Sequence, residues 1–305
     1  MSIHHKLICT AFLCVSVSVF AQPIVKEGKT VKVSPHVYLI PDERVGMVPN
    51  VGIIVGTRAT LVVDPGMGQK SGEAVLREMD KVSKNKDIYL VNTHFHPEHT
   101  TGDLAFPASA KLLRAAAQQE DVDEMGMKWV AIFANRGPAL REQLHGAKFR
   151  EPVEIFEKEK TLDLGGVRVK MVRLGPGHSR GDTAIFVEGD NVLFAGDLAM
   201  KQLFPAFATP QSRLASWLTS LDALDAMRPV KIIGAHYDMG DASMISAYRG
   251  FLTALRDRVA EMKKQGKSSD ETAETLRAEF RTKYPDWDQP LRIHAAATAI
   301  YRELP

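Results

Sequence analysis

The chain has 305 residues, of which 45% are hydrophobic and 25% are charged, with 22 glycines, 16 prolines and two cysteines. This composition excludes a disulfide scaffold, a collagen-like repeat and a disordered tail protein, and the length allows a sizeable hydrophobic core. The 39 basic and 37 acidic side chains nearly cancel, leaving a net charge of +2. Because no overall field favours nucleic acid or an anionic membrane, we expect a small-molecule substrate and no nucleic-acid partner.

Residues 1–21 have the pattern of a secretory signal peptide. A basic start with Lys6 precedes an apolar run from Leu7 to Phe20, and Ala21 supplies a small residue at its end. The run is shorter than the ~18–20 residues that a bilayer span needs, although an uncleaved anchor remains an alternative. Cleavage after Ala21 would remove both cysteines, Cys9 and Cys14. We therefore expect a periplasmic or secreted protein without thiols and without stable membrane insertion.

The following segment predicts a sheet covered by helices. Apolar, β-branched runs on both sides of residues 56–58 indicate a β-hairpin, and residues 72–82 have apolar positions close to helical spacing. A strand–helix–strand order is typical of α/β architecture. Strands are expected at 37–40, 51–55, 59–63, 88–91, 167–174, 183–187, 192–195 and 230–233, and helices at 72–82 and 212–227.

Two segments lie outside this pattern. Residues 111–150 are rich in Ala, Gln, Glu and Met, and we expect helices there, on the rim of a site. Beyond Asp241 the chain is expected to be helical, with Ser268 and Glu271 forming a capping box. Because no low-complexity linker divides the chain, residues 22–305 are predicted to form one domain, with 241–305 as a helical C-terminal extension.

The strongest chemical motif is His94-Phe95-His96-Pro97-Glu98-His99, directly after the expected strand 88–91. These side chains cannot all face one way on a strand or a helix, but they can converge on a turn. Neutral imidazole and carboxylate are the ligands that zinc prefers when no thiolate is present. The motif therefore predicts a metal site.

Further polar residues end other strands or lie in turns between them. Asp64, Asp197 and His236 each follow an apolar run, and a glycine-rich turn carries His178 and Asp182. Each alone is weak evidence, since Asp and His are common turn residues. Their repeated placement is informative, because α/β folds gather functional groups at the carboxyl ends of strands.

Together these motifs resemble the metallo-β-lactamase superfamily, over about residues 36–240. The resemblance implies a four-layer αββα sandwich, here with extra C-terminal helices, and two zinc ions. Carried over by position, it implies one zinc ion held by His94, His96 and His178, a second held by Glu98, His99 and His236, Asp197 bridging both, and Asp64 and Asp182 orienting ligands.

One position departs from the family pattern, which normally has Asp where this chain has Glu98. The additional methylene moves the carboxylate outward. It could still reach the second metal, weaken that site or shift its preference, so another divalent metal remains an alternative to zinc.

The resemblance implies a di-zinc hydrolase in which metal-activated water attacks a carbonyl, with Glu98 and Asp197 as catalytic carboxylates, and the signal-peptide pattern predicts that it is exported. We expect a small cyclic amide or ester as substrate, with a β-lactam as the most concrete case. Lys201 and Arg180 are candidates for holding a substrate carboxylate, and Tyr237 for offering a hydroxyl. Aromatic and methionine side chains of the rim could form an apolar lip: Met125, Met127, Trp129, Phe133 and Phe149.

Two alternatives remain open at this point. The first is a periplasmic lactonase, thioesterase or accessory protein of an oxidative pathway, without an antibiotic role. The second is a non-catalytic metal-binding protein that has kept the fold.

Overall fold

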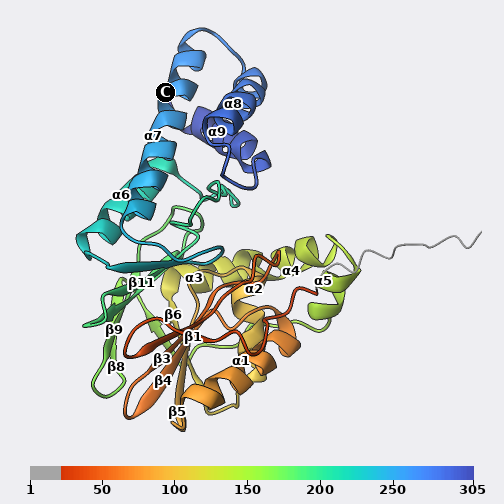
Figure 1. Cartoon of the computed structure of the whole chain (residues 1–305). Coiled ribbons are helices and arrows are strands. Elements are labelled where there is room, and N and C mark those ends of the chain that lie inside the picture. The colour runs from red at the N-terminus through yellow and green to blue at the C-terminus, as the bar shows by residue number, and fades with distance from the viewer. Residues whose placement is uncertain (1–21) are drawn as a thin grey trace, which may run out of the picture.

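Two β-sheets pack face to face, and helices cover their outer faces (Figure 1). The structure is a computed structural model that describes residues 22–305. The expected signal peptide, residues 1–21, lies outside the described residues. Among residues 22–305, no helix combines the length and the apolar character needed to cross a membrane.

The first sheet has seven strands that follow one another in chain order. Strands β1 to β4 pair antiparallel, whereas β4 to β7 run parallel. Its strands are β1 Val31–Lys32, β2 Val37–Ile40, β3 Val51–Val55, β4 Ala59–Val63, β5 Asp87–Val91, β6 Lys111–Ala115 and β7 Glu154–Phe156.

The second sheet has five strands in the order β12-β11-β10-β9-β8. All of its neighbours pair antiparallel except β11 and β12, which are parallel. Its strands are β8 Glu159–Asp163, β9 Arg168–Arg173, β10 Thr183–Glu188, β11 Val192–Gly196 and β12 Lys231–Gly234.

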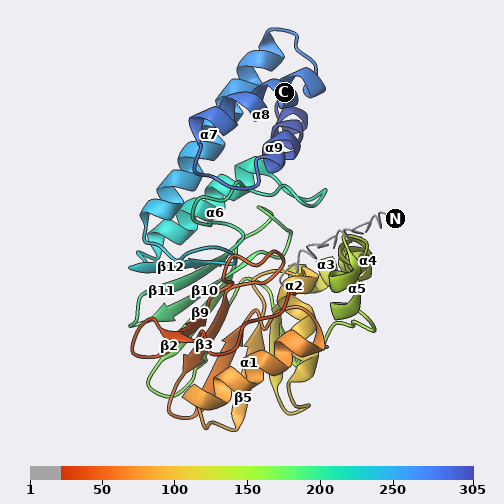
Figure 2. The same cartoon turned by 45° about the vertical axis from the view of Figure 1, so that its right-hand side comes forward.

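Most helices lie on the outer faces or at the open edge of the sandwich, and the last two pack beyond it against the long helix that precedes them (Figure 2). Helix α1 covers the first sheet, α6 and α7 cover the second, and the short helices α2 to α5 lie at one edge. The helices are α1 Gly68–Val82, α2 Pro97–Thr100, a 3₁₀ turn Thr101–Ala105, α3 Ala116–Asp121, a π turn Val122–Gly126, α4 Met127–Ala134, α5 Pro138–Gln143, α6 Leu214–Ala226, α7 Ser243–Lys264, α8 Ser269–Lys283 and α9 Leu291–Glu303.

Strand β4 shows how alternate side chains build two cores. Leu61 and Val63 point into the space between the sheets, where they join Phe194 of β11. Val62, between them, joins Val75 of α1 on the outer face. Because side chains alternate across a strand and both faces of this one are buried, its sequence is apolar except for Thr60, whose hydroxyl lies 2.6 Å from Ser83 Oγ.

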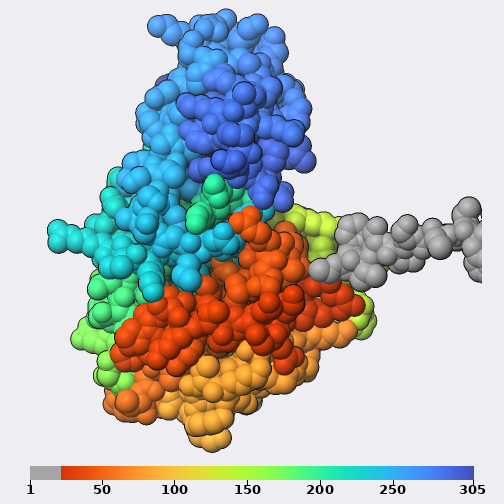
Figure 3. Space-filling model, in the orientation of Figure 1, coloured from red at the N-terminus to blue at the C-terminus, as the bar shows by residue number. Residues whose placement is uncertain are grey.

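A third core joins the second sheet to the C-terminal helices. Leu193 of β11 packs with Trp217 of α6 and Tyr248 of α7. Farther out, the Phe251 ring lies 5.6 Å from Phe280 of α8, between ring centroids. Helices α7 to α9 therefore extend the same core, and they project from one end of the sandwich (Figure 3).

The four-layer sandwich and its additional C-terminal helices confirm the expected fold class. One expectation was wrong: within 111–150, residues Lys111–Ala115 form strand β6, which pairs parallel with β5. The segment lacks a clean strand pattern because Arg114 is buried in it, where its Nη1 donates to Gln119 at 2.6 Å and its Nη2 to the carbonyl of Arg150 at 3.1 Å. Strands β1, β7 and β8, which are short or largely exposed, were not predicted either.

The expected capping box at the start of α8 is formed. Ser268 Oγ accepts from the Glu271 amide at 3.2 Å, and Glu271 Oε2 accepts from the Ser268 amide at 2.9 Å. Ser268→Ala removes one of these bonds, so we expect a loss of about 1 kcal/mol in the free energy of unfolding, measured by urea denaturation. Ser269→Ala is the matched control, because the Ser269 hydroxyl has no partner among the described residues. Equal stabilities for the two variants would contradict the prediction.

Candidate metal centre

Seven side chains of metal-binding type meet at the edge of the sandwich where strands of both sheets end. His94 and His96 follow β5, and α2 carries the next two. The second sheet supplies the others from the loop between β9 and β10, the end of β11 and the end of β12. All are buried: His94, His96, Glu98, His99, His178, Asp197 and His236.

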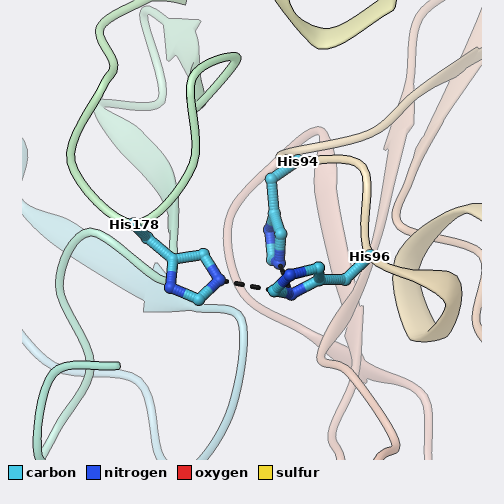
Figure 4. A group of neighbouring side chains, drawn as sticks. All are labelled: His94, His96 and His178. Carbon is cyan, nitrogen blue, oxygen red and sulfur yellow. Dashed lines mark hydrogen bonds between the residues drawn. The ribbon is translucent and has the colours of Figure 1, made fainter. Parts of the chain in front are cut away.

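Three imidazoles form the first group. His94 and His96 approach from one loop and His178 from another, and their rings converge (Figure 4). His96 Nδ1 lies 3.0 Å from His94 Nε2 and 3.3 Å from His178 Nε2. In a tetrahedral zinc site with bonds of ~2.0–2.1 Å, two ligand nitrogens are roughly 3.3 Å apart. The spacing therefore fits three ligands of one ion.

Glu98, His99 and His236 form the second group. Glu98 Oε1 lies 3.7 Å from His99 Nε2, so the longer side chain still reaches this group. Asp197 lies between the two groups. Its Oδ2 is 3.6 Å from His178 Nε2 of the first, and its Oδ1 is 4.0 Å from His236 Nε2 of the second.

Hydrogen bonds on the far side of three rings orient their free nitrogens. The Nδ1–H of His178 donates to the carbonyl of Ala206 at 2.7 Å, and that of His236 to the carbonyl of Val48 at 2.9 Å. His99 Nδ1 lies 3.0 Å from Asp64 Oδ2 in the same arrangement. With Nδ1 protonated, each Nε2 carries a lone pair toward the centre, as metal ligation requires.

Burial sets the charge state of the cluster. It lowers the pKa of His94, His96 and His99 well below the usual value, so these rings are neutral and their lone pairs are available. Burial also raises the pKa of Glu98 to about 8.

Four buried polar atoms of the cluster have no hydrogen-bond partner within residues 22–305. They are His96 Nε2, His99 Nε2, Glu98 Oε2 and Asp197 Oδ1. A buried polar atom without a partner costs ~1–3 kcal/mol. All four residues belong to the groups that could hold a metal ion, and bound divalent ions would satisfy His99 Nε2 and Asp197 Oδ1. The donor set, imidazole and carboxylate without thiolate, suits zinc.

Asp64 supports the cluster from behind, at the end of β4. Its Oδ1 accepts from the amide of Thr93 at 2.7 Å, and its Oδ2 accepts from Thr93 Oγ1 at 2.7 Å as well as facing His99. Thr93, which sequence reasoning passed over, thus links Asp64 to the motif. Gly196 adopts a φ of +57°, and a side chain there would meet Thr93 at 2.9 Å. Only glycine therefore allows β11 to deliver Asp197 so close to the first loop.

Asp182 organises the loop that carries His178. Its carboxylate accepts from the backbone amides of Gly177, His178 and Ser179 at 2.7 to 3.1 Å, and from Ser179 Oγ at 2.6 Å. Ser212 Oγ donates to the carbonyl of His178 at 2.7 Å. These bonds hold the His178 backbone at both its amide and its carbonyl.

The cluster opens into a cavity of about 400 Å³. Five of the seven side chains line its floor, and aromatic rings form its walls. Trp129 and Phe133 of the predicted rim take part, and the Trp129 ring centroid lies 4.2 Å from that of His96. The Met125, Met127 and Phe149 side chains of the expected lip are not among the residues that line it.

The three candidates for substrate contacts do not line this cavity. Arg180 forms ion pairs with Glu120 at 2.8 Å and with Glu124. Its positive charge is therefore neutralised by these two carboxylates. Lys201 lines a different hollow beside α7. The Tyr237 hydroxyl donates to Asp288 at 2.9 Å, and Tyr237 is not among the residues that line the cavity.

The cavity is also lined by residues that no sequence pattern identified. Phe207 comes from the irregular segment before α6, Arg136 from the turn after α4, and Arg292 from α9. They are far apart along the chain and belong to no motif, so only the folded arrangement brings them together.

Comparison with known proteins identifies the family. Residues 44–236 match the model of the metallo-beta-lactamase superfamily, so the chain belongs to this superfamily. The expected membership is therefore confirmed, and it agrees with the layered fold and the histidine-rich cluster.

Its relatives are distant. The acyl-coenzyme A thioesterase MBLAC2 of Gallus gallus is 22% identical over 209 residues, which cover 64% of this chain and 75% of that protein. The linear primary-alkylsulfatase of Pseudomonas sp. (strain ATCC 19151) is 20% identical over 262 residues, covering 74% and 49%. The solved sec-alkylsulfatase Pisa1 of Pseudomonas sp. is 17% identical with a TM-score of 0.68, over 90% of this chain and 50% of that one.

The chain thus spans about half the length of both alkylsulfatases. Family membership and these relatives together support a hydrolytic enzyme that acts on small molecules.

The role of Asp182 in positioning His178 can be tested through stability. Asp182→Asn places an amide N–H opposite backbone donors, so we expect the free energy of unfolding to fall by about 2–3 kcal/mol. Asp222→Asn is the control, because Asp222 pairs with Arg249 on the exposed surface and such pairs contribute ~0–1 kcal/mol. Urea denaturation measures both, and an Asp182→Asn variant as stable as the control would contradict this role.

Proposed function

We propose that this protein is an exported two-metal hydrolase that cleaves a small carbonyl substrate, such as an ester, a thioester or a β-lactam. One observation carries the proposal: two groups of buried ligand atoms, with Asp197 between them, lie at the floor of an open cavity. A purely structural metal site is closed, whereas a catalytic one keeps an open position. Export rests on the signal-peptide pattern of residues 1–21.

The residues divide into two ligand sets under this proposal. When bound, the ions supply Lewis-acid polarisation of the carbonyl and lower the pKa of water. His94, His96 and His178 would hold one ion, Glu98, His99 and His236 the other, and Asp197 would contact both. Zinc suits this set, although the position of Glu98 leaves another divalent metal possible for the second group.

The chain's own carboxylates handle the proton. Glu98 and Asp197 both line the cavity, and Glu98 Oε2 has no partner among the described residues. In the reaction, the water oxygen bonds to the carbonyl carbon and the bond to the leaving atom breaks. The proton released by the water passes through Glu98 Oε2 or Asp197 to the leaving atom.

The walls act on the rest of the substrate. Trp129, Phe133 and Phe207 present apolar surface beside the floor, which suits a substrate with an apolar part. No lining residue selects a particular substrate ring, so we propose a β-lactam only as one member of the substrate class.

Cleavage of a sulfate ester is the second candidate. The likeness to the sec-alkylsulfatase covers 90% of this chain, well beyond the residues 44–236 of the family match. The same two-ion floor could polarise a sulfuryl oxygen in place of a carbonyl oxygen.

A substrate panel on zinc-loaded mature protein tests the proposal. The panel contains a chromogenic β-lactam, a lactone, an aryl ester, an acyl thioester and an alkyl sulfate, with metal content measured in parallel. We expect two ions per chain and turnover of at least one carbonyl substrate. His178→Ala should lose this turnover, whereas His145→Gln, an exposed histidine outside the metal-type groups, should keep it.

Each other outcome excludes part of the proposal. Turnover of the alkyl sulfate alone would select the sulfatase. Bound metal without turnover of any substrate would favour a non-catalytic metal-binding protein.

Metal affinity tests the support that Asp64 gives to His99. In Asp64→Asn, the amide N–H₂ would face two donors, Thr93 Oγ1–H and His99 Nδ1–H. We expect zinc to bind about 10- to 100-fold more weakly, measured by competition with a chromophoric chelator. Asp190→Asn is a close control, because Asp190 accepts from Ser34 and His36 in the same way but outside the centre. Unchanged zinc affinity in Asp64→Asn would contradict the assignment.

A further inference from the structure

The cavity above the candidate metal centre has a cationic side. Arg136, in the turn after α4, and Arg292, in the first turn of α9, both line it together with His96 and Glu98. The two arginines are 156 positions apart in the sequence, yet they share one cavity. Two guanidinium groups therefore lie beside the candidate metal centre.

Neither arginine is neutralised by a carboxylate. Arg136 Nη1 lies 3.3 Å from Met47 Sδ, and Arg292 Nη1 donates to the carbonyl of Phe204 at 3.1 Å. No ion pair involves either side chain within residues 22–305. By contrast, Arg180 on the outside of α3 contacts three acidic side chains. A guanidinium group offers five N–H donors, so most donors of the two cavity arginines are free for a ligand.

Aromatic packing gives one of them a defined position. The Arg136 guanidinium carbon lies 4.3 Å from the centre of the Phe133 ring, and Phe133 is itself buried. A stacked guanidinium group loses less freedom when it binds an oxyanion. Arg136 is exposed on its other face and Arg292 is partly buried, so solvent and ligands can reach the pair.

Apolar side chains line the same cavity as the arginines and the metal-type residues. They are Trp129, Phe133 and Phe207, with Leu291, which is 71% exposed, at the rim. The cavity therefore presents three kinds of surface within about 400 Å³: metal ligands, an apolar wall and two uncompensated cations.

We propose that Arg136 and Arg292 bind an oxyanion on the substrate, so that this site takes an anionic amphiphile. The scissile bond would lie at the floor, the apolar part against Trp129 and Phe207, and a carboxylate or sulfo group at the arginines. The position of the scissile bond rests on the proposed hydrolase function, whereas the anion site does not. The sequence analysis also expected a cationic side chain to hold a substrate carboxylate. It selected Arg180 and Lys201, which do not line this cavity.

Calorimetric titration with three probes of one shape tests the proposal. The probes are 4-phenylbutanoate, 4-phenylbutane-1-sulfonate and the neutral 4-phenylbutanamide, added to metal-loaded protein. Removing charged hydrogen bonds in Arg136→Gln/Arg292→Gln should weaken binding of the preferred anion roughly 10- to 100-fold. Binding of the amide should not change. The tighter of the two anions identifies the substrate's anionic group.

Arg141→Gln is the matched control, since it removes one positive charge from exposed α5 outside the cavity. It should leave all three affinities as they are. Circular dichroism and metal content confirm that each variant is folded and loaded.

Three results would overturn the proposal. The first is anion binding that survives in the double variant, because the metal ions alone would then hold the probe. The second is equal weakening of anion and amide binding, which indicates loss of cavity shape. The third is no measurable binding of either anion to the unchanged protein at millimolar concentration.

This test is independent of turnover. If the double variant loses anion binding but no panel substrate is cleaved, the anion site stands and the hydrolase proposal fails. If a neutral ester is cleaved and the anions bind equally to the unchanged protein and the double variant, the hydrolase proposal stands and the anion site fails.

Discussion

The structure depends on one costly convergence: seven buried imidazole and carboxylate side chains meet at one place, and several of their polar atoms have no hydrogen-bond partner among the described residues. His96 Nδ1 lies 3.0 Å from His94 Nε2 and 3.3 Å from His178 Nε2. Neutral nitrogens without a shared proton repel at such distances, and buried lone pairs without donors cost free energy. A divalent cation turns each of these costs into a bond. The rest of the fold serves to hold the groups in this arrangement.

The scaffold does so by holding both the backbone and the imidazole rings of the ligand residues with hydrogen bonds. Strands buried on both faces, such as β4 and β5, end at one edge and deliver Asp64 and the histidine motif there. Asp182 then holds the amide of His178, and Asp64 connects Thr93 to His99. Because the supporting carboxylates bind backbone and ring N–H groups, the ligand positions are set before any ion arrives. The cavity opens at the same edge of the sandwich, so the strand ends that carry the ligand residues also let a substrate reach them.

Sequence reasoning found the fold and the cluster because both depend on local patterns. Apolar runs marked most strands, and the motif from His94 to His99 is contiguous. Prediction from the sequence failed where contacts between distant residues determine the structure. Strand β6 contains Arg114, whose burial is explained only by Gln119 and Arg150. Arg136 and Arg292 belong to no motif, whereas Arg180, a candidate from the sequence, is paired with Glu120 of α3 and Glu124 of the following π turn. The length of Glu98 also left its reach open until the fold placed it 3.7 Å from His99.

The most direct test of the central claim is the position of the metal itself. Crystals of residues 22–305 grown with zinc, measured at the zinc absorption edge, give an anomalous difference map. We expect two peaks about 3.5–4 Å apart, one among His94, His96 and His178 and the other among Glu98, His99 and His236, with Asp197 between them. A single peak, or peaks that lie away from these side chains, would contradict it.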